Sequence, residues 1–75
     1  MIKPRDLFYA LQQQLEDVAV IESVAFVRLD QGVKVDVDYY KGGKKKKIST
    51  DFDEWAIEAG AADILVKELL KKIGL

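Results

Sequence analysis

The sequence predicts a small α+β domain with the element order α-β-β-β-α, in which two helices pack on one face of a three-stranded antiparallel meander. Three observations carry this prediction: an apolar stripe at helical spacing near the N terminus, two glycine-containing turns between strand-like segments, and a second helical stripe near the C terminus. At 75 residues the chain has room for a single domain, spanning residues 1–75, and its hydrophobic content of 49% is sufficient for one core.

The first helix is expected at residues 4–17. Pro4 suits the first helical turn, where its missing N–H costs no hydrogen bond. The apolar residues that follow recur at the spacing of one helical face, namely Leu7, Phe8, Leu11, Leu15 and Val18. This spacing predicts a helix that packs on the sheet with one side.

The first hairpin is expected to turn at Asp30-Gln31-Gly32, with Gly32 in the left-handed conformation of a three-residue loop. This loop places Leu29 opposite Val33. A two-residue loop would shift the pairing by one residue and set Arg28 opposite a valine, so the three-residue loop is preferred. The inner face of the sheet is then predicted to contain Ala25, Val27, Leu29, Val33, Val35, Val37 and Ile48.

The second hairpin is expected to turn at Gly42-Gly43, because two glycines readily supply the positive φ angles of a tight turn. The pairing then sets Val37 opposite Ile48 on the same inner face. On the outer face, Asp38 is expected opposite Lys47 and Tyr40 opposite Lys45.

The second helix is expected at residues 51–73, with Thr50 or Asp51 as its N-cap and Gly74 as its end. Its core stripe is predicted to contain Phe52, Trp55, Ala56, Ala59, Ala62, Val66, Leu69, Leu70 and Ile73. A second stripe beside it, formed by Ile57, Ala61 and Ile64, would pack either on the first helix or on a partner, and homodimerisation is one way to bury it.

The residue types argue against catalysis. There is no histidine and no cysteine, so the usual general bases and thiol nucleophiles are missing, and no catalytic residue or cofactor is predicted. Asp36 and Asp38 are the one carboxylate pair with suitable spacing for a cation, but two carboxylates are too few, and no metal site is predicted. The net charge of -1 and the lack of a long apolar run indicate a cytoplasmic protein that does not bind membranes.

A basic segment at residues 41–47 stands out in this acidic chain. It contains five lysines, Lys41, Lys44, Lys45, Lys46 and Lys47. These lysines would either bind phosphate groups of a nucleic acid or protect the edge of the sheet from pairing with other chains, and edge protection is the favoured interpretation.

The outer face of the sheet is the other candidate surface, because the predicted register makes Val24, Phe26 and Tyr40 face outward among charged residues. Aromatic residues flanked by charge are typical of protein interfaces.

The α-β-β-β-α order, which covers nearly the whole chain, is similar to that of double-stranded-RNA-binding domains. That family carries a basic cluster at the start of its last helix, where it spans phosphates across the groove. Here the corresponding segment is Asp51-Phe52-Asp53-Glu54, whose charge would repel phosphate. The resemblance therefore implies the topology and not the RNA-binding surface.

These observations favour a non-enzymatic protein–protein interaction module or adaptor, which binds an unknown protein or forms a homodimer. A phage or plasmid accessory protein would fit this size. The alternative is a nucleic-acid-binding domain that uses the basic hairpin at residues 41–47, with Tyr40 available to stack on a base.

Overall fold

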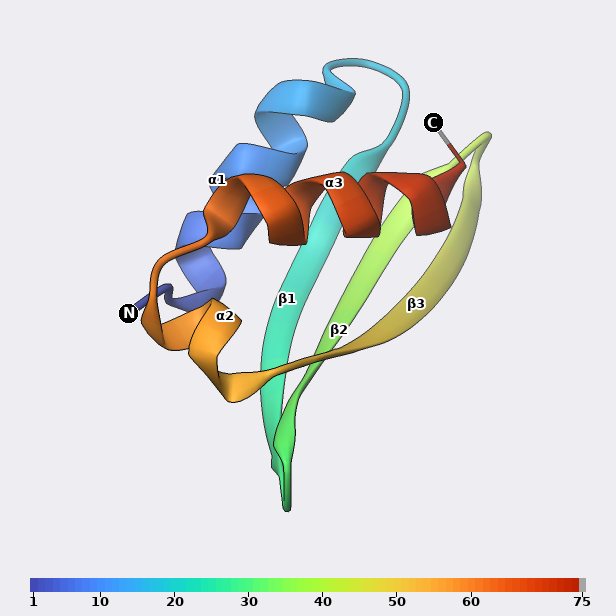
Figure 1. The fold of residues 1–75 in the computed structure, drawn as a ribbon. Helices are drawn as coiled ribbons and strands as arrows, with labels where there is room; N and C mark the ends of the chain where they lie inside the picture. The colour runs from blue at the N-terminus through green and yellow to red at the C-terminus, as the bar shows by residue number, and fades with distance from the viewer. Residues whose placement is uncertain (75) are drawn as a thin grey trace.

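The computed structural model describes residues 1–74 and confirms an α+β fold in which the helices cover one face of a β1-β2-β3 antiparallel meander (Figure 1). The elements are α1 (Pro4–Leu15), β1 (Val20–Leu29), β2 (Gly32–Lys41), β3 (Lys44–Phe52), α2 (Glu54–Glu58) and α3 (Ala62–Ile73). We call the face beneath the helices the covered face and the opposite one the open face. The helix α1 also reaches over β1, one of the two edge strands.

The first helix begins at Pro4 as predicted but ends at Leu15 rather than at residue 17. Glu16 takes a positive φ of 50°, which ends the helical hydrogen-bonding pattern. Leu7, Leu11 and Leu15 are fully buried on the predicted stripe, whereas Val18 lies beyond the helix and is exposed.

The side chain of Gln12 joins the end of α1 to the beginning of β1. Its amide nitrogen Nε2 donates to the carbonyl oxygens of Ala19, at 2.9 Å, and Glu16, at 3.2 Å, while its oxygen Oε1 accepts from the N–H of Ile21 at 2.7 Å. One polar side chain thus satisfies three backbone groups that neither the helix nor the sheet satisfies, and it fixes where β1 starts relative to α1.

The prediction of a single helix at residues 51–73 is wrong, because this segment contains the end of β3 and two separate helices. The strand β3 continues to Phe52, so Thr50 and Asp51 belong to the sheet and do not cap a helix. Gly60, with a φ of +73°, separates α2 from α3. The predicted end is confirmed, since Gly74 adopts the left-handed conformation after α3.

The second hairpin has the predicted register. Val37 lies opposite Ile48, Asp38 opposite Lys47, and Tyr40 opposite Lys45. Gly42 and Gly43 both have positive φ angles, 61° and 76°, as a two-residue hairpin turn requires.

The predicted register of the first hairpin is wrong by one residue. The loop contains only Asp30 and Gln31, so Arg28 rather than Leu29 lies opposite Val33. Gly32 does not have a positive φ. Instead, a Cβ atom there would lie 2.5 Å from the carbonyl oxygen of Phe52, so close backbone approach is what requires glycine at this position.

The shift exchanges the two faces of β1. Val24 and Phe26 lie on the covered face and pack partly against the core, whereas Ala25, Val27 and Leu29 lie on the open face and are exposed. The prediction that Val24 and Phe26 face outward is therefore wrong.

A β-bulge corrects the alternation at the start of β1. The register shifts between Ile21 and Ser23, which makes Glu22 the extra residue. Because of this bulge, both Ile21 and Val24 face the core although they are three residues apart. Ile21 is buried opposite Tyr39.

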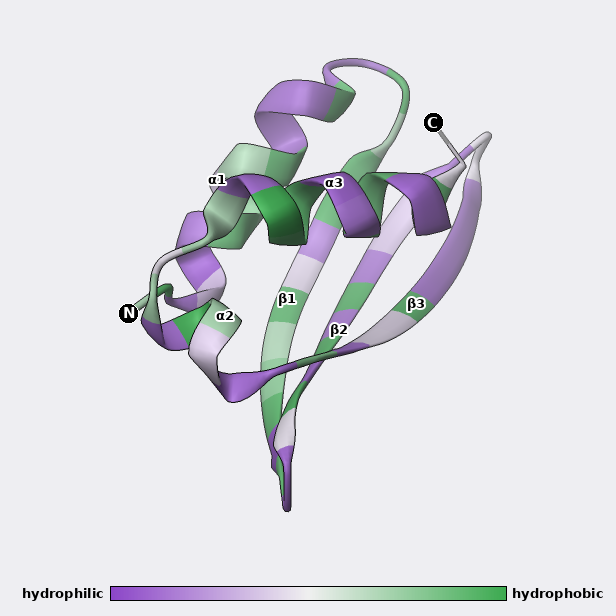
Figure 2. Ribbon diagram, viewed as in Figure 1, coloured by the Kyte–Doolittle hydropathy of each residue, from purple (hydrophilic) through white to green (hydrophobic). Residues whose placement is uncertain are grey.

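The core lies between the covered face and the helices. Its largest fully buried side chains come from both layers, and they are Leu7, Leu11, Leu15, Val35, Val37, Leu65 and Leu69. Figure 2 shows the apolar bands of β1 and β2 beside the hydrophilic upper part of β3. Within residues 1–74, no helix is long and apolar enough to cross a membrane.

Candidate functional site

The structure does not bring the predicted protein-binding residues together on one surface. Val24 and Phe26 are half-buried on the covered face, and Ile57 is a buried core residue with 4% exposure. Tyr40 is exposed on the open face. Ile64, with 53% exposure, is the exposed residue of the predicted second stripe, and Ala61 is half-buried beside the core.

The free edge of β1 is the strongest candidate site. Within the described residues β1 pairs only with β2, so one of its sides presents unpaired backbone N–H and C=O groups. The residues from Ser23 to Val27 along this edge carry no charge. An uncharged strand edge with unpaired backbone groups is able to accept an additional strand.

A groove of about 420 Å³ lies beside this edge, between α1 and β1. It is lined by Pro4, Arg5, Phe8, Tyr9, Ser23 and Val24. The rings of Phe8 and Tyr9 meet edge to face with centroids 5.7 Å apart, and Tyr9 is 69% exposed. The groove therefore offers an aromatic wall and one guanidinium group to a side chain that enters from the edge.

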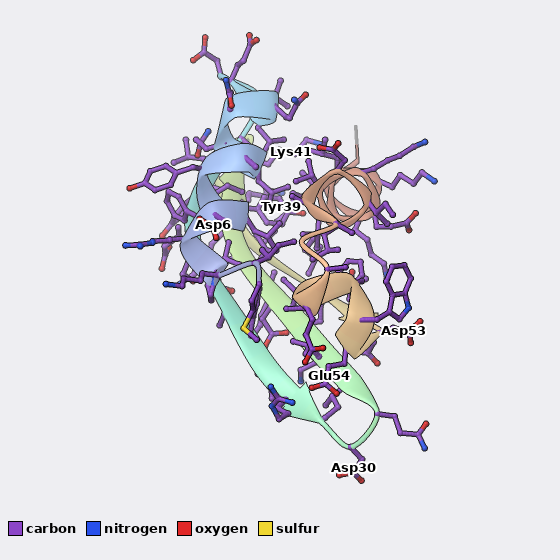
Figure 3. The ribbon with its side chains drawn as sticks, turned by 60° about the vertical axis from the view of Figure 1, so that its left-hand side comes forward. Asp6, Asp30, Tyr39, Lys41, Asp53 and Glu54 are labelled. Atoms are coloured by element: carbon purple, nitrogen blue, oxygen red, sulfur yellow. The ribbon has the colours of Figure 1, made fainter. Side chains whose placement is uncertain are left out.

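The helix α1 overlies only one half of β1. Its N-terminal residues Pro4 to Tyr9 lie near Ser23 and Val24, and Gln12 bonds to the strand start at Ile21. Figure 3 shows α1, labelled at Asp6, over the first half of β1, while the strand continues clear of the helix to the turn at Asp30. The helix α1 thus lies over the first half of β1 and not over the second half.

The open face of β1 is also apolar. Val20, Val27 and Leu29 are exposed there, and Tyr40 of the neighbouring strand lies opposite Val20. A strand added to this edge would meet apolar side chains on both faces of the sheet.

The cationic side chains do not gather on one surface. Lys45 and Lys47 share the open face with Tyr40, whereas Lys44 and Lys46 belong to the covered face by register. Arg28 lies at the opposite end of the sheet, where its Nη1 is 2.7 Å from Oε1 of Glu54, and this contact raises the pKa of Arg28. The lysines thus surround an edge strand rather than form a single basic patch.

A polar row crosses the open face near the second hairpin. Oε1 of Glu22 lies 3.3 Å from Nζ of Lys45, and hydrogen bonding to Glu22, followed by its negative charge, raises the pKa of Lys45. The pKa of Tyr40 is raised for the same two reasons. This row joins β1 to β3 across the central strand.

The carboxylate pair considered for a metal ion is occupied by hydrogen bonds. Asp36 accepts from the hydroxyl of Ser49, and Asp38 accepts from the hydroxyl of Ser23 at 3.1 Å. In the part of the chain that the structure describes, no three acidic side chains are grouped closely enough to hold a metal ion.

Of the residues that line the groove, only Val24 was predicted from the sequence to bind a protein, and Arg5, Phe8, Tyr9 and Ser23 were missed. Tyr9 lies off the apolar stripe of α1, and a single exposed aromatic residue is no signal in a sequence, so the groove is recognised only once α1 is placed beside β1. The free edge itself follows from the meander order, because the first strand of a meander is always at an edge.

Comparison of the chain with protein-family models, with curated proteins and with solved structures gives no match. The similarity to double-stranded-RNA-binding domains is one of element order. In the segment that corresponds to their basic cluster, Asp51 lies within the last two residues of β3 and Asp53 precedes α2.

Proposed function

We propose that this protein is a protein–protein interaction module that accepts an extended segment as a fourth strand on the free edge of β1. The observation that carries the proposal is the uncharged, unpaired edge lying beside an apolar groove. In strand addition, backbone hydrogen bonds supply affinity, and pockets for alternate side chains supply specificity. The groove between α1 and β1 lies where such a pocket is needed.

The groove also defines what the added strand should contain. A side chain entering it contacts Phe8, Tyr9 and Val24, so an aromatic or branched aliphatic residue fits. The next side chain on the same strand points to the open face, near Ala25 and Val27, where apolar residues are again favoured. The binding segment is therefore a short, extended and largely apolar one.

Selection from a library of random peptides tests the proposal. The selected peptides should be rich in β-branched and aromatic residues, and their binding should weaken at least about tenfold in the Val27→Lys variant, because a lysine there introduces charge beside the added strand. Ile64→Lys is the matched control, since it places the same charge on an exposed apolar residue of α3. Peptides that bind Val27→Lys and the unmodified protein equally would contradict the proposal.

Nucleic-acid binding is the second candidate, and one contact favours it. Nζ of Lys41 donates to the carbonyl oxygen of Ile73 at 3.1 Å, which brings the last turn of α3, with Lys71 and Lys72, to the lysine-bearing hairpin. Replacing Lys44 to Lys47 with serine should then abolish binding of single-stranded DNA at low salt. If the unmodified protein binds no DNA at low salt, this candidate is wrong.

A further inference from the structure

We infer that the strand accepted at this edge is β1 of a second copy, running antiparallel, so that two chains form one continuous six-stranded sheet. The inference deepens the proposed function and rests on it. Its basis is that the uncharged β1 edge is complementary to itself in side-chain chemistry and in shape.

The distribution of charge along β1 selects the register. The uncharged run from Ser23 to Val27 has Ala25 at its centre, so a two-fold axis at Ala25 places the two runs side by side. The charged residues that bound the run already have partners within their own chain, since Glu22 pairs with Lys45 on the open face and Arg28 pairs with Glu54 on the covered side. An axis at Val24 would instead bring Glu22 to the strand position opposite Phe26, and an axis at Phe26 would bring Arg28 opposite Val24, so either shift puts a charged residue inside the paired segment.

In the register centred on Ala25, Val24 of each chain lies opposite Phe26 of the other. Both residues belong to the covered face and are only half-buried in the single chain. On the open face, Val27 of each chain lies opposite Ser23 of the other. Aromatic and β-branched residues that face each other across strands stabilise a sheet.

The shape of the edge is complementary in the same arrangement. In each chain α1 overlies the first half of β1 and leaves the second half bare. Antiparallel pairing brings the second half of β1 in one chain, which α1 does not overlie, beside the first half of β1 in the other chain, which α1 overlies. Phe26 of the second copy then points toward the groove that Phe8 and Tyr9 line, and the exposed ring of Tyr9 gains a contact.

The other edge limits the assembly to two chains. In the paired sheet the outer edges are the two β3 strands, and each carries four consecutive lysines from Lys44 to Lys47. Lysines on an edge strand oppose further strand addition. The result is a closed, symmetric dimer rather than an open fibre.

Cross-linking through a single cysteine tests the register directly, because the chain has no cysteine of its own. In the inferred dimer the two Ala25 Cα atoms lie directly opposite each other, about 4.5–5.5 Å apart, which a disulfide can span. Under mild oxidation Ala25→Cys should therefore give a disulfide-linked dimer of twice the chain mass. Val27→Cys is the matched control on the same face. Its two copies would lie about 13 Å apart, four residues out of register, and should remain unlinked.

The dissociation constant provides a second readout that does not depend on oxidation. Light scattering of the unmodified protein at high micromolar concentration should give the mass of two chains. Val27→Lys should weaken the dimer about tenfold, and Ile64→Lys should leave it unchanged. A monomer at this concentration, or equal cross-linking of Ala25→Cys and Val27→Cys, would overturn the inference.

The two levels of the proposal fail differently. If the chain is a monomer but selected peptides bind it and lose affinity in Val27→Lys, the second copy is the wrong occupant and the proposed function stands. If neither peptides nor a second copy use the edge, both are wrong.

Discussion

The two edge strands of the sheet share the same neighbour, β2, but differ in charge. The edge of β3 carries lysine at four consecutive positions, whereas the edge of β1 has a run of five uncharged residues, Ser23 to Val27. Both edges present unpaired backbone groups, so the hydrogen-bonding potential alone does not distinguish them. Side-chain charge, rather than hydrogen-bonding potential, is therefore what distinguishes the two edges of this sheet.

The two edges also differ in the contacts that the helices make near them. The helix α1 reaches over β1 and forms a groove there, and Gln12 fixes the strand start by three hydrogen bonds. At the other side, Lys41 at the end of β2 donates to the C-terminal end of α3. The uncharged edge is therefore the one that lies beside a groove able to bind a side chain of an added strand.

Removing positive charge from β3 should make the two sheet edges more alike. We expect this change to have the largest effect, which is on the association of chains. In a Lys45→Thr and Lys47→Thr double variant, both open-face lysines of β3 become β-branched residues that favour strand pairing. We expect particles larger than those of the unmodified protein, growing with concentration in light scattering. Lys67→Thr with Lys72→Thr on α3 removes the same charge away from the edge, and this control should not grow. Equal particle sizes in both double variants would show that net charge, rather than edge charge, matters.

Disturbing the close contact between Gly32 and β3 should have the next largest effect, which is on the free energy of unfolding. Gly32→Ala places a Cβ atom against the carbonyl oxygen of Phe52, so we expect the free energy of unfolding to fall by about 2–3 kcal/mol. Gly43→Ala strains only a positive φ angle in open space and should cost about 1 kcal/mol. Urea denaturation measures both. If the two variants were equally stable, β3 would not pass as close to β2 as described.

The anchor of β1 should have an intermediate effect. Gln12→Ala leaves the backbone groups of Ala19 and Ile21 without their partner, and we expect a loss of about 1–2 kcal/mol in the free energy of unfolding. The exposed neighbour provides the control, because Gln13→Ala should change stability little. Faster hydrogen exchange at the start of β1, and not in β3, would locate the effect at this edge. A uniform change over the sheet would contradict a local anchor.

The polar row across the open face should have the smallest effect. Glu22→Gln weakens the hydrogen bonding and removes the negative charge that together raise the pKa of Tyr40 and Lys45, so both pKa values should fall toward their ordinary values, which NMR titration can follow. Because these pKa values are raised in the folded protein, the stabilisation by Glu22 is complete below the unfolded values and is lost as the pH rises through the folded ones. The stability of the variant should therefore decline less at alkaline pH. Unchanged titration of Tyr40 would contradict this account.

The sequence predicted most of the fold because its signals are local. The stripe of α1, the Gly42-Gly43 turn and the left-handed end at Gly74 each depend on a few neighbouring residues. The register of the first hairpin was predicted wrongly because Gly32 was assumed to serve the turn. Its real constraint comes from Phe52, which lies 20 residues away along the chain and cannot be recognised from spacing.

The candidate site was less predictable than the fold. The wrong register placed Phe26 on the open face, and the groove depends on where α1 crosses β1, which packing rather than periodicity decides. Likewise, Gly60 interrupts an apolar pattern that would suit one long helix. Features that arise from contacts between distant segments need the three-dimensional structure.

The bulge at Glu22 also bears on how this chain tolerates changes in length. Counted without Glu22, the residues from Ile21 to Phe26 alternate perfectly between the covered and open faces. Glu22 thus behaves as a one-residue insertion that the strand absorbs without moving its core side chains. Loss of this codon would preserve the hydrophobic core and remove the link to Lys45, whereas loss of Ala25 would put every later residue of β1 on the opposite face. Neighbouring positions in one strand therefore differ sharply in their tolerance of deletion.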